Sequence, residues 1–149
     1  MMDYEHTQKS PLGWILAVTG LLILIITWLI SGNQIAPILI SFTIAIILVF
    51  VSMCFGSLTV HDERDSLAIS FGPLPIFRTR IEYSEITEVQ IDRSNILDGW
   101  GIHCIPGRGW TYNVWGFDCV RIQKGKKIIR VGTDDKEALF SFLKTRFRA

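Results

Sequence analysis

Residues 12–30 read LGWILAVTGLLILIITWLI and residues 35–55 read IAPILISFTIAIILVFVSMCF, two apolar runs that decide the architecture of the chain. At about 1.5 Å rise per residue, a helix of either length crosses a hydrocarbon core of about 30 Å. Because a backbone in lipid must satisfy its own hydrogen bonds, both runs are predicted to be helices in spite of their many Ile and Val residues. The short connector 31–34 then predicts a membrane α-helical hairpin over residues 12–55.

The distribution of charge agrees with a membrane segment. The chain has 149 residues, of which 49% are hydrophobic and 19% are charged, and positions 10–60 contain no Asp, Glu, Lys or Arg. An ordinary soluble domain carries about 25% charged residues. The gap excludes a single soluble domain, a disordered chain and a collagen-like chain. The three cysteines are too few for a small disulfide scaffold.

Other interpretations of the two runs fit less well. A cleaved signal peptide would have an apolar region of about 7–15 residues, whereas the first run is longer and is followed by a second. A buried hairpin of a soluble protein would show polar faces, and neither run has one. Neither run contains Asp, Glu, Lys, Arg or His. Because proton and ion paths usually need such a group, the hairpin is expected to anchor the chain rather than to transport a solute.

Two spans place both ends of the chain on the same side of the membrane. The connector 31–34 has no Lys or Arg, whereas Lys9 precedes the first span and fourteen Lys and Arg follow the second. The positive-inside rule therefore predicts a multi-pass protein of the cell (inner) membrane with both termini in the cytoplasm. Cys104 and Cys119 are then expected to be reduced thiols, with one disulfide between them as the alternative. Residues 1–11 are expected to be an N-terminal tail.

Residues 56–149 change to short β-like runs separated by turn signals. Hydrophobic and polar residues alternate over 67–71 and 77–83, and two hairpins are predicted, at 100–105 with 109–114 and at 118–123 with 126–131. The spacing predicts seven or eight antiparallel strands. Because an antiparallel run closed by a helix leaves few exposed sheet edges, we expect a small α+β barrel.

The last element reads as an amphipathic helix. Asp134 and Glu137 have the spacing of a capping box. Leu139, Phe142, Leu143 and Phe147 then form one apolar stripe. This helix is expected to close one end of the barrel.

Two strings of the domain resemble a known family. They are GIHCIPGRGWTYNVWGFDCVRI over residues 101–122 and KKIIRVGTDD over residues 126–135. These strings are similar to the bacterial PH-like (pleckstrin-homology-like) domains of small membrane proteins with two transmembrane helices. The resemblance implies a split β-barrel of about seven strands, in two bent antiparallel sheets, with a C-terminal helix. It implies no catalytic residues.

A basic segment is the first candidate binding surface. Residues 121–149 hold nine Lys and Arg against three Asp and Glu. Anionic lipid headgroups attract such cations by about 1 kcal/mol each, and the alternative is a hairpin turn that is simply solvated. The candidate lipid-binding residues are Arg121, Lys124, Lys126, Lys127 and Arg130. Nucleic acid is not expected as a partner, because the domain has little net charge and lacks a recognisable nucleic-acid motif.

An aromatic cluster is the second candidate surface. Exposed rings could meet a peptide, a protein partner or the membrane interface; alternatively, some rings belong to the core and others cover the ends of hairpins. The candidate partner-binding residues are Trp100, Trp110, Tyr112 and Trp115.

Catalytic and metal sites have little support in the sequence. Zinc sites usually present Cys and His in short paired spacings, whereas Cys104 and Cys119 are single and far apart. His103 and Cys104 are adjacent, so a regular strand points them to opposite faces. We therefore expect no metal, no cofactor and no enzymatic activity. The sequence predicts a membrane-anchored module that docks a protein or peptide partner, or a second copy of itself, with anionic-lipid sensing through residues 121–130 as the alternative.

Overall fold

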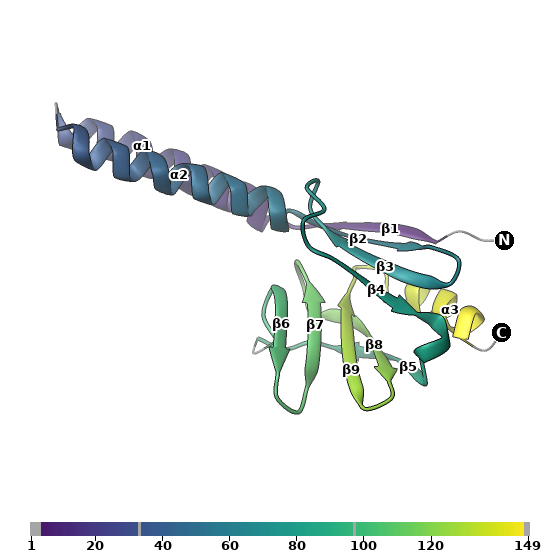
Figure 1. The fold of residues 1–149 in the computed structure, drawn as a ribbon. Coiled ribbons are helices and arrows are strands. Elements are labelled where there is room, and N and C mark those ends of the chain that lie inside the picture. The colour runs from purple at the N-terminus through teal and green to yellow at the C-terminus, as the bar shows by residue number, and fades with distance from the viewer. Residues whose placement is uncertain (1–3, 33, 97, 148–149) are drawn as a thin grey trace.

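The computed structural model of the chain describes residues 4–32, 34–96 and 98–147. Asn33, part of the predicted connector, and Leu97 lie outside these ranges. The described part holds two long apolar helices, two β-sheets and a C-terminal helix, an α+β arrangement (Figure 1). The helices are α1 (Leu12–Ser31), α2 (Ile35–Phe55), the short 3-10 helix η1 (Tyr83–Glu85) and α3 (Lys136–Phe147). The strands are β1 (Glu5–Lys9), β2 (Ser57–Asp62), β3 (Ser66–Phe71), β4 (Arg78–Glu82), β5 (Glu88–Arg93), β6 (Gly101–Ile105), β7 (Gly109–Asn113), β8 (Asp118–Lys124) and β9 (Lys127–Gly132).

Helices α1 and α2 confirm the predicted hairpin. They pack closely through small residues: a Cβ at Gly20 would lie 3.3 Å from the Cα of Ala45, and Ser52 Oγ donates a hydrogen bond to the carbonyl oxygen of Gly13 at 2.7 Å. Most of their large apolar side chains are exposed, and both helices are long and apolar enough to cross a membrane. An exposed apolar surface of this extent is suited to lipid.

The expected N-terminal tail contains a strand of the folded domain. β1 pairs antiparallel with β2, with Thr7 opposite Thr59, and the N–H of Ser10 donates to the carbonyl oxygen of Gly56 at 2.8 Å. The helical hairpin explains this pairing, because it returns the chain to the point from which it left. The segments on its two flanks therefore lie side by side, and the edge of β2 offers hydrogen-bond partners to β1. The domain thus includes residues that precede the two long apolar helices.

The nine strands of the described residues form two sheets. Sheet A has the order β1-β2-β3-β4 and sheet B has the order β5-β8-β9-β7-β6. Both predicted hairpins are present in sheet B. The expectation of antiparallel pairing throughout is wrong at one place, because β7 runs parallel to β9 with Trp110 opposite Ile129. The β6–β7 hairpin joins sheet B at the free edge of β9, and hydrophobic alternation does not reveal the direction of such a pairing.

Helix α3 closes one side of the space between the sheets. Its stripe confirms the expected amphipathic helix, since Leu139 and Leu143 are fully buried in the common core. Burial of each leucine contributes about 1.5–3 kcal/mol. Polar contacts hold its last turn, where Arg146 pairs with the carboxylate of Asp62 and the hydroxyl of Tyr83 donates to the same carboxylate at 2.8 Å.

The helix begins differently from the expected capping box. The side chain of Asp135, not that of Asp134, accepts the hydrogen bond from the backbone N–H of Ala138, at 3.1 Å. Asp134 instead pairs with His6 on β1. Asp134 and Asp135 are adjacent in the sequence, and the position of His6 on β1 decides that Asp134 forms the pair while Asp135 caps the helix.

Candidate binding groove and aromatic surfaces

The two sheets leave an opening on the side away from α3. Helix α3 packs against β5 and β8 at one edge of sheet B, whereas β7 and β6 lie at the other edge (Figure 1). On that open side lies a cavity of about 240 Å³, here called the open groove. Its lining combines apolar and aromatic side chains with the polar side chains of Arg78 and Thr79, and comprises Ile69, Phe71, Ile76, Phe77, Arg78, Thr79, Ile102 and Tyr112. Pockets for drug-sized ligands measure about 300–1,000 Å³, so this groove is better matched to one or two side chains of a peptide.

Two unpaired strand edges flank the open groove. Within the described part of the chain, β4 pairs only with β3 and β6 pairs only with β7. Each therefore presents a row of backbone N–H and C=O groups that another extended segment can bind. β4 also supplies Thr79 to the lining of the groove. A strand added to β4 would place alternate side chains toward the cavity.

Two of the four predicted aromatic residues belong to this side of the molecule. Tyr112 lines the open groove, and Trp110 stacks on it with ring centroids 6.3 Å apart and an angle of 18° between the rings. They lie two residues apart on β7 and therefore share one face of the strand. Trp110 is 42% exposed. The two rings extend the apolar surface along β7 from the groove to the solvent.

The other two aromatic residues form a separate pair. The rings of Trp100 and Trp115 stack with centroids 4.5 Å apart, and Trp100 Nε1 donates to the carbonyl oxygen of Gly116 at 3.3 Å. The pair lies close to the start of α1, because Ser10 Oγ donates to the carbonyl oxygen of Val114 at 3.0 Å. The predicted single aromatic surface is thus two surfaces, one beside the open groove and one beside the start of α1.

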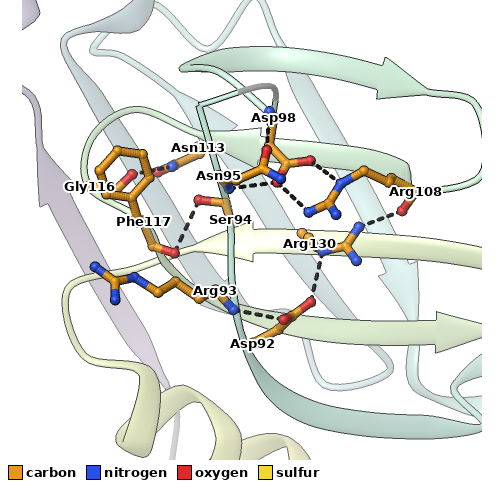
Figure 2. Close-up of polar contacts among 10 residues, drawn as sticks. All are labelled: Asp92, Arg93, Ser94, Asn95, Asp98, Arg108, Asn113, Gly116, Phe117 and Arg130. Carbon is orange, nitrogen blue, oxygen red and sulfur yellow. Dashed lines mark hydrogen bonds and ion pairs between the residues drawn. The ribbon is translucent and has the colours of Figure 1, made fainter.

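A buried polar cluster holds the segment that leads to Trp100 (Figure 2). The side chain of Asp98 is fully buried, and Arg108 donates to it from Nε at 2.8 Å and from Nη2 at 2.6 Å. The N–H of Asn95 donates to the same carboxylate at 2.8 Å. The hydrogen bonds from Arg108 lower the pKa of Asp98 below its ordinary value, against the opposing effect of burial. Sequence reasoning missed this cluster, because nothing in the spacing pairs a loop aspartate with an arginine in a hairpin turn.

The same cluster includes Arg130, which was expected on the basic surface. Its side chain is only 8% exposed; Nε donates to Asp92 Oδ2 at 2.9 Å, and a second donor binds the carbonyl oxygen of Arg108. Arg130 lies between Ile129 and Val131 on β9 and therefore points away from the core, toward the face that the segment before Trp100 crosses (Figure 2). The prediction of Arg130 as a lipid-binding residue missed this burial, because the covering segment comes from a loop far from it in the sequence.

The remaining basic residues lie along the β8–β9 hairpin. Arg121 donates to the side chain of Gln123 at 3.1 Å, and Lys124 pairs with Glu85. Lys126 and Lys127 are exposed at the turn, which lies at the end of sheet B away from α1 and α2 (Figure 1). If α1 and α2 lie in a bilayer, this placement argues against contact between that bilayer and the turn that carries Lys126 and Lys127.

The residues considered for catalysis are dispersed. Cys104 lies exposed on β6 and Cys119 lies buried on β8, both as free thiols. β7 and β9 separate these strands, a spacing of about 14 Å that no disulfide spans. Burial raises the pKa of Cys119 to about 12, which keeps this thiol protonated and a poor nucleophile. His103 lies on β6, where its Nε2 is 2.9 Å from the carbonyl oxygen of Trp100.

No protein-family model matches the chain, and no curated protein matches it.

Proposed function

We propose that this protein is a membrane-anchored binding module whose open groove docks an extended segment of a protein partner at the membrane surface. The observation that carries the proposal is the position of the groove, which lies between the unpaired edge of β4 and the apolar face of β6 and β7. Backbone hydrogen bonds to β4 would supply affinity, and side chains entering the cavity would supply selectivity.

The groove also lies close to the membrane helices. The ring of Phe77, which lines the groove, stacks on the ring of Phe55 at the end of α2 with centroids 5.3 Å apart. A segment in the groove would therefore run near the bilayer surface. This position suits a partner that is itself a membrane protein, bound through the residues that adjoin its own span.

We assign the domain to a variant of the PH-like fold that its sequence resembles. The two sheets and α3 correspond to the two sheets and C-terminal helix that the resemblance implies, with nine strands in the described residues where about seven were expected. The helical hairpin lies between β1 and β2, and β6 and β7 lie within the string of residues 101–122 that carries the resemblance. These two strands supply one wall of the open groove.

We assign the domain to the cytoplasmic side of the cell membrane and assign it binding rather than catalysis. The charge asymmetry across the helical hairpin supports the cytoplasmic side. The buried charged side chains of Asp98, in the segment that crosses sheet B, and of Arg130, on β9, bind other protein groups and stabilise a loop. We therefore place the partner surface at the open groove and not at this charged cluster.

The test is site-specific photocrosslinking in native membranes. A benzophenone amino acid replaces Trp110, at the rim of the groove, and for comparison replaces Ile91, which is 43% exposed on β5 at the opposite edge of sheet B. We expect one discrete adduct from position 110 and none of that mass from position 91. An adduct of twice the chain mass identifies the partner as a second copy of this protein.

A groove-filling variant decides whether the groove itself binds. Thr79→Trp places a large ring in the cavity and should abolish the adduct at position 110. Thr87→Trp, at an exposed position next to β5, should leave it unchanged. An adduct that persists at full yield in Thr79→Trp, with thermal unfolding unaltered, refutes docking in the groove.

A further inference from the structure

The apolar loop between β3 and β4 lies against the end of α2. Residues 72–77 read GPLPIF and carry no charge. Gly72 has a φ of +64° and approaches the helix so closely that a Cβ there would lie 2.1 Å from the carbonyl oxygen of Met53. Beyond this contact, Ile76 is 58% exposed. The loop therefore exposes the apolar side chain of Ile76 near the last turn of α2.

The Trp100–Trp115 pair occupies a second position beside the helix ends. Gln8 Nε2 donates to the carbonyl oxygen of Trp115 at 2.9 Å, which fixes this residue to the strand that leads into α1. A Cβ at Gly101, next to Trp100, would lie 3.8 Å from the ring of Phe55. Trp100 and Trp115 are each more than one-third exposed. The loop 72–77 and the Trp100–Trp115 pair, which are distant in sequence, thus both place apolar side chains around the end of the helical hairpin.

A crevice next to these elements combines apolar residues with one lysine. It is lined by residues of both helix ends, by Pro73 of the loop and by Lys9. Lys9 is the last cation before the uncharged stretch 10–60. Trp is enriched where a membrane meets water, and Lys is favourable beside lipid phosphates. The crevice therefore presents an apolar wall and one cation at the level where headgroups begin.

We propose that this face of the domain is seated in the interfacial layer of the bilayer. The surface, here called the membrane collar, consists of Leu74, Ile76, Phe77, Trp100 and Trp115. Its occupant is phospholipid, because the collar continues the apolar surface of α1 and α2 at the level where the hairpin ends. The collar fixes the orientation of the domain and directs the mouth of the open groove along the membrane surface. Ile76 and Phe77 also line the open groove, so the collar borders the partner site proposed above.

The test uses the full chain in vesicles of phosphatidylcholine and phosphatidylglycerol. With Cys104→Ser as background, an environment-sensitive fluorophore is attached at Ile76→Cys and at Trp115→Cys. Matched sites are Ser141→Cys, exposed on α3, and Lys126→Cys at the β8–β9 turn. We expect lipids with a spin label near the headgroup to quench positions 76 and 115, and aqueous iodide to quench positions 126 and 141.

The two quenchers together distinguish a position 76 in lipid from one in water and from one covered by protein. Iodide quenching at position 76 equal to that at 126 would place the loop in water and overturn the proposal. Protection of position 76 from both quenchers would place it under protein and would also overturn it. Ile76 is exposed in a loop, so its substitution leaves the core intact; the result at 76 therefore stands even where Trp115→Cys unfolds the protein. Failure of the photocrosslinking test leaves this result unaffected, because no partner is present in the vesicles.

Discussion

Arg108 donates two hydrogen bonds, of 2.8 and 2.6 Å, to the buried carboxylate of Asp98. The aspartate comes from the segment that crosses sheet B, and the arginine comes from the β6–β7 turn (Figure 2). Two-bond pairs between arginine and carboxylate are strong and geometrically selective. This contact therefore holds the segment that ends at Trp100 against the β6–β7 hairpin, which forms one wall of the open groove.

Removal of Arg108 should destabilise the fold. Arg108→Ala leaves the Asp98 carboxylate buried without its main partner, and we expect a loss of about 3 kcal/mol in the free energy of unfolding. Urea unfolding of the full chain in detergent micelles measures this loss. Arg64→Ala, which removes an exposed arginine, should change the free energy by less than about 0.5 kcal/mol. An equal effect of both substitutions would show that the pair does not stabilise the loop.

The contribution of Asp98 should depend on pH. Its pKa is lower in the folded protein than the ordinary value of 3.8, so the ionised carboxylate stabilises the fold above that value. This stabilisation is lost as the pH falls through the lower, folded-state pKa. The difference in unfolding free energy between the wild type and Asp98→Asn should therefore be largest near neutral pH and should shrink below pH ~3. A difference that stays constant between pH 7 and the most acidic pH would contradict the assignment.

Gly72 should be intolerant of any side chain. Gly72→Ala adds the strain of a positive φ, about 1–2 kcal/mol, to a clash with the carbonyl oxygen of Met53. Gly125 is the matched control, because its φ is +56° and a Cβ there would have open space around it. We expect Gly72→Ala to lower the midpoint of thermal unfolding clearly more than Gly125→Ala. Equal shifts would mean that the domain is not held against α2 at this point.

The cysteines should differ sharply in reactivity. Cys104 is exposed, whereas Cys119 is buried with a pKa raised to about 12. At pH 8, a maleimide should modify Cys104 within minutes and should modify Cys119 only after unfolding. Mass spectrometry of the digested protein identifies the labelled sites. Rapid modification of Cys119 in the folded protein would show that the segment crossing sheet B opens readily.

The aromatic residues show how far sequence reasoning reaches. Alternation along β7 places Trp110 and Tyr112 on one face, and this could be read from the sequence. The stack of Trp100 on Trp115 joins two loops, and the residue before Trp115, Val114, accepts a hydrogen bond from Ser10, 104 positions earlier in the chain. Local patterns carry no information about such contacts.

The sequence by itself determined the helical hairpin, the two hairpins of sheet B and the apolar stripe of α3. The helical hairpin follows from the length of two uncharged apolar runs, and the other elements follow from local alternation or helical spacing of apolar residues. Only the tertiary structure decided that β1 joins sheet A, that β7 runs parallel to β9 and that Arg130 is buried. Those outcomes depend on which surfaces meet across the domain, and many sequences with the same local patterns could pair their edges differently.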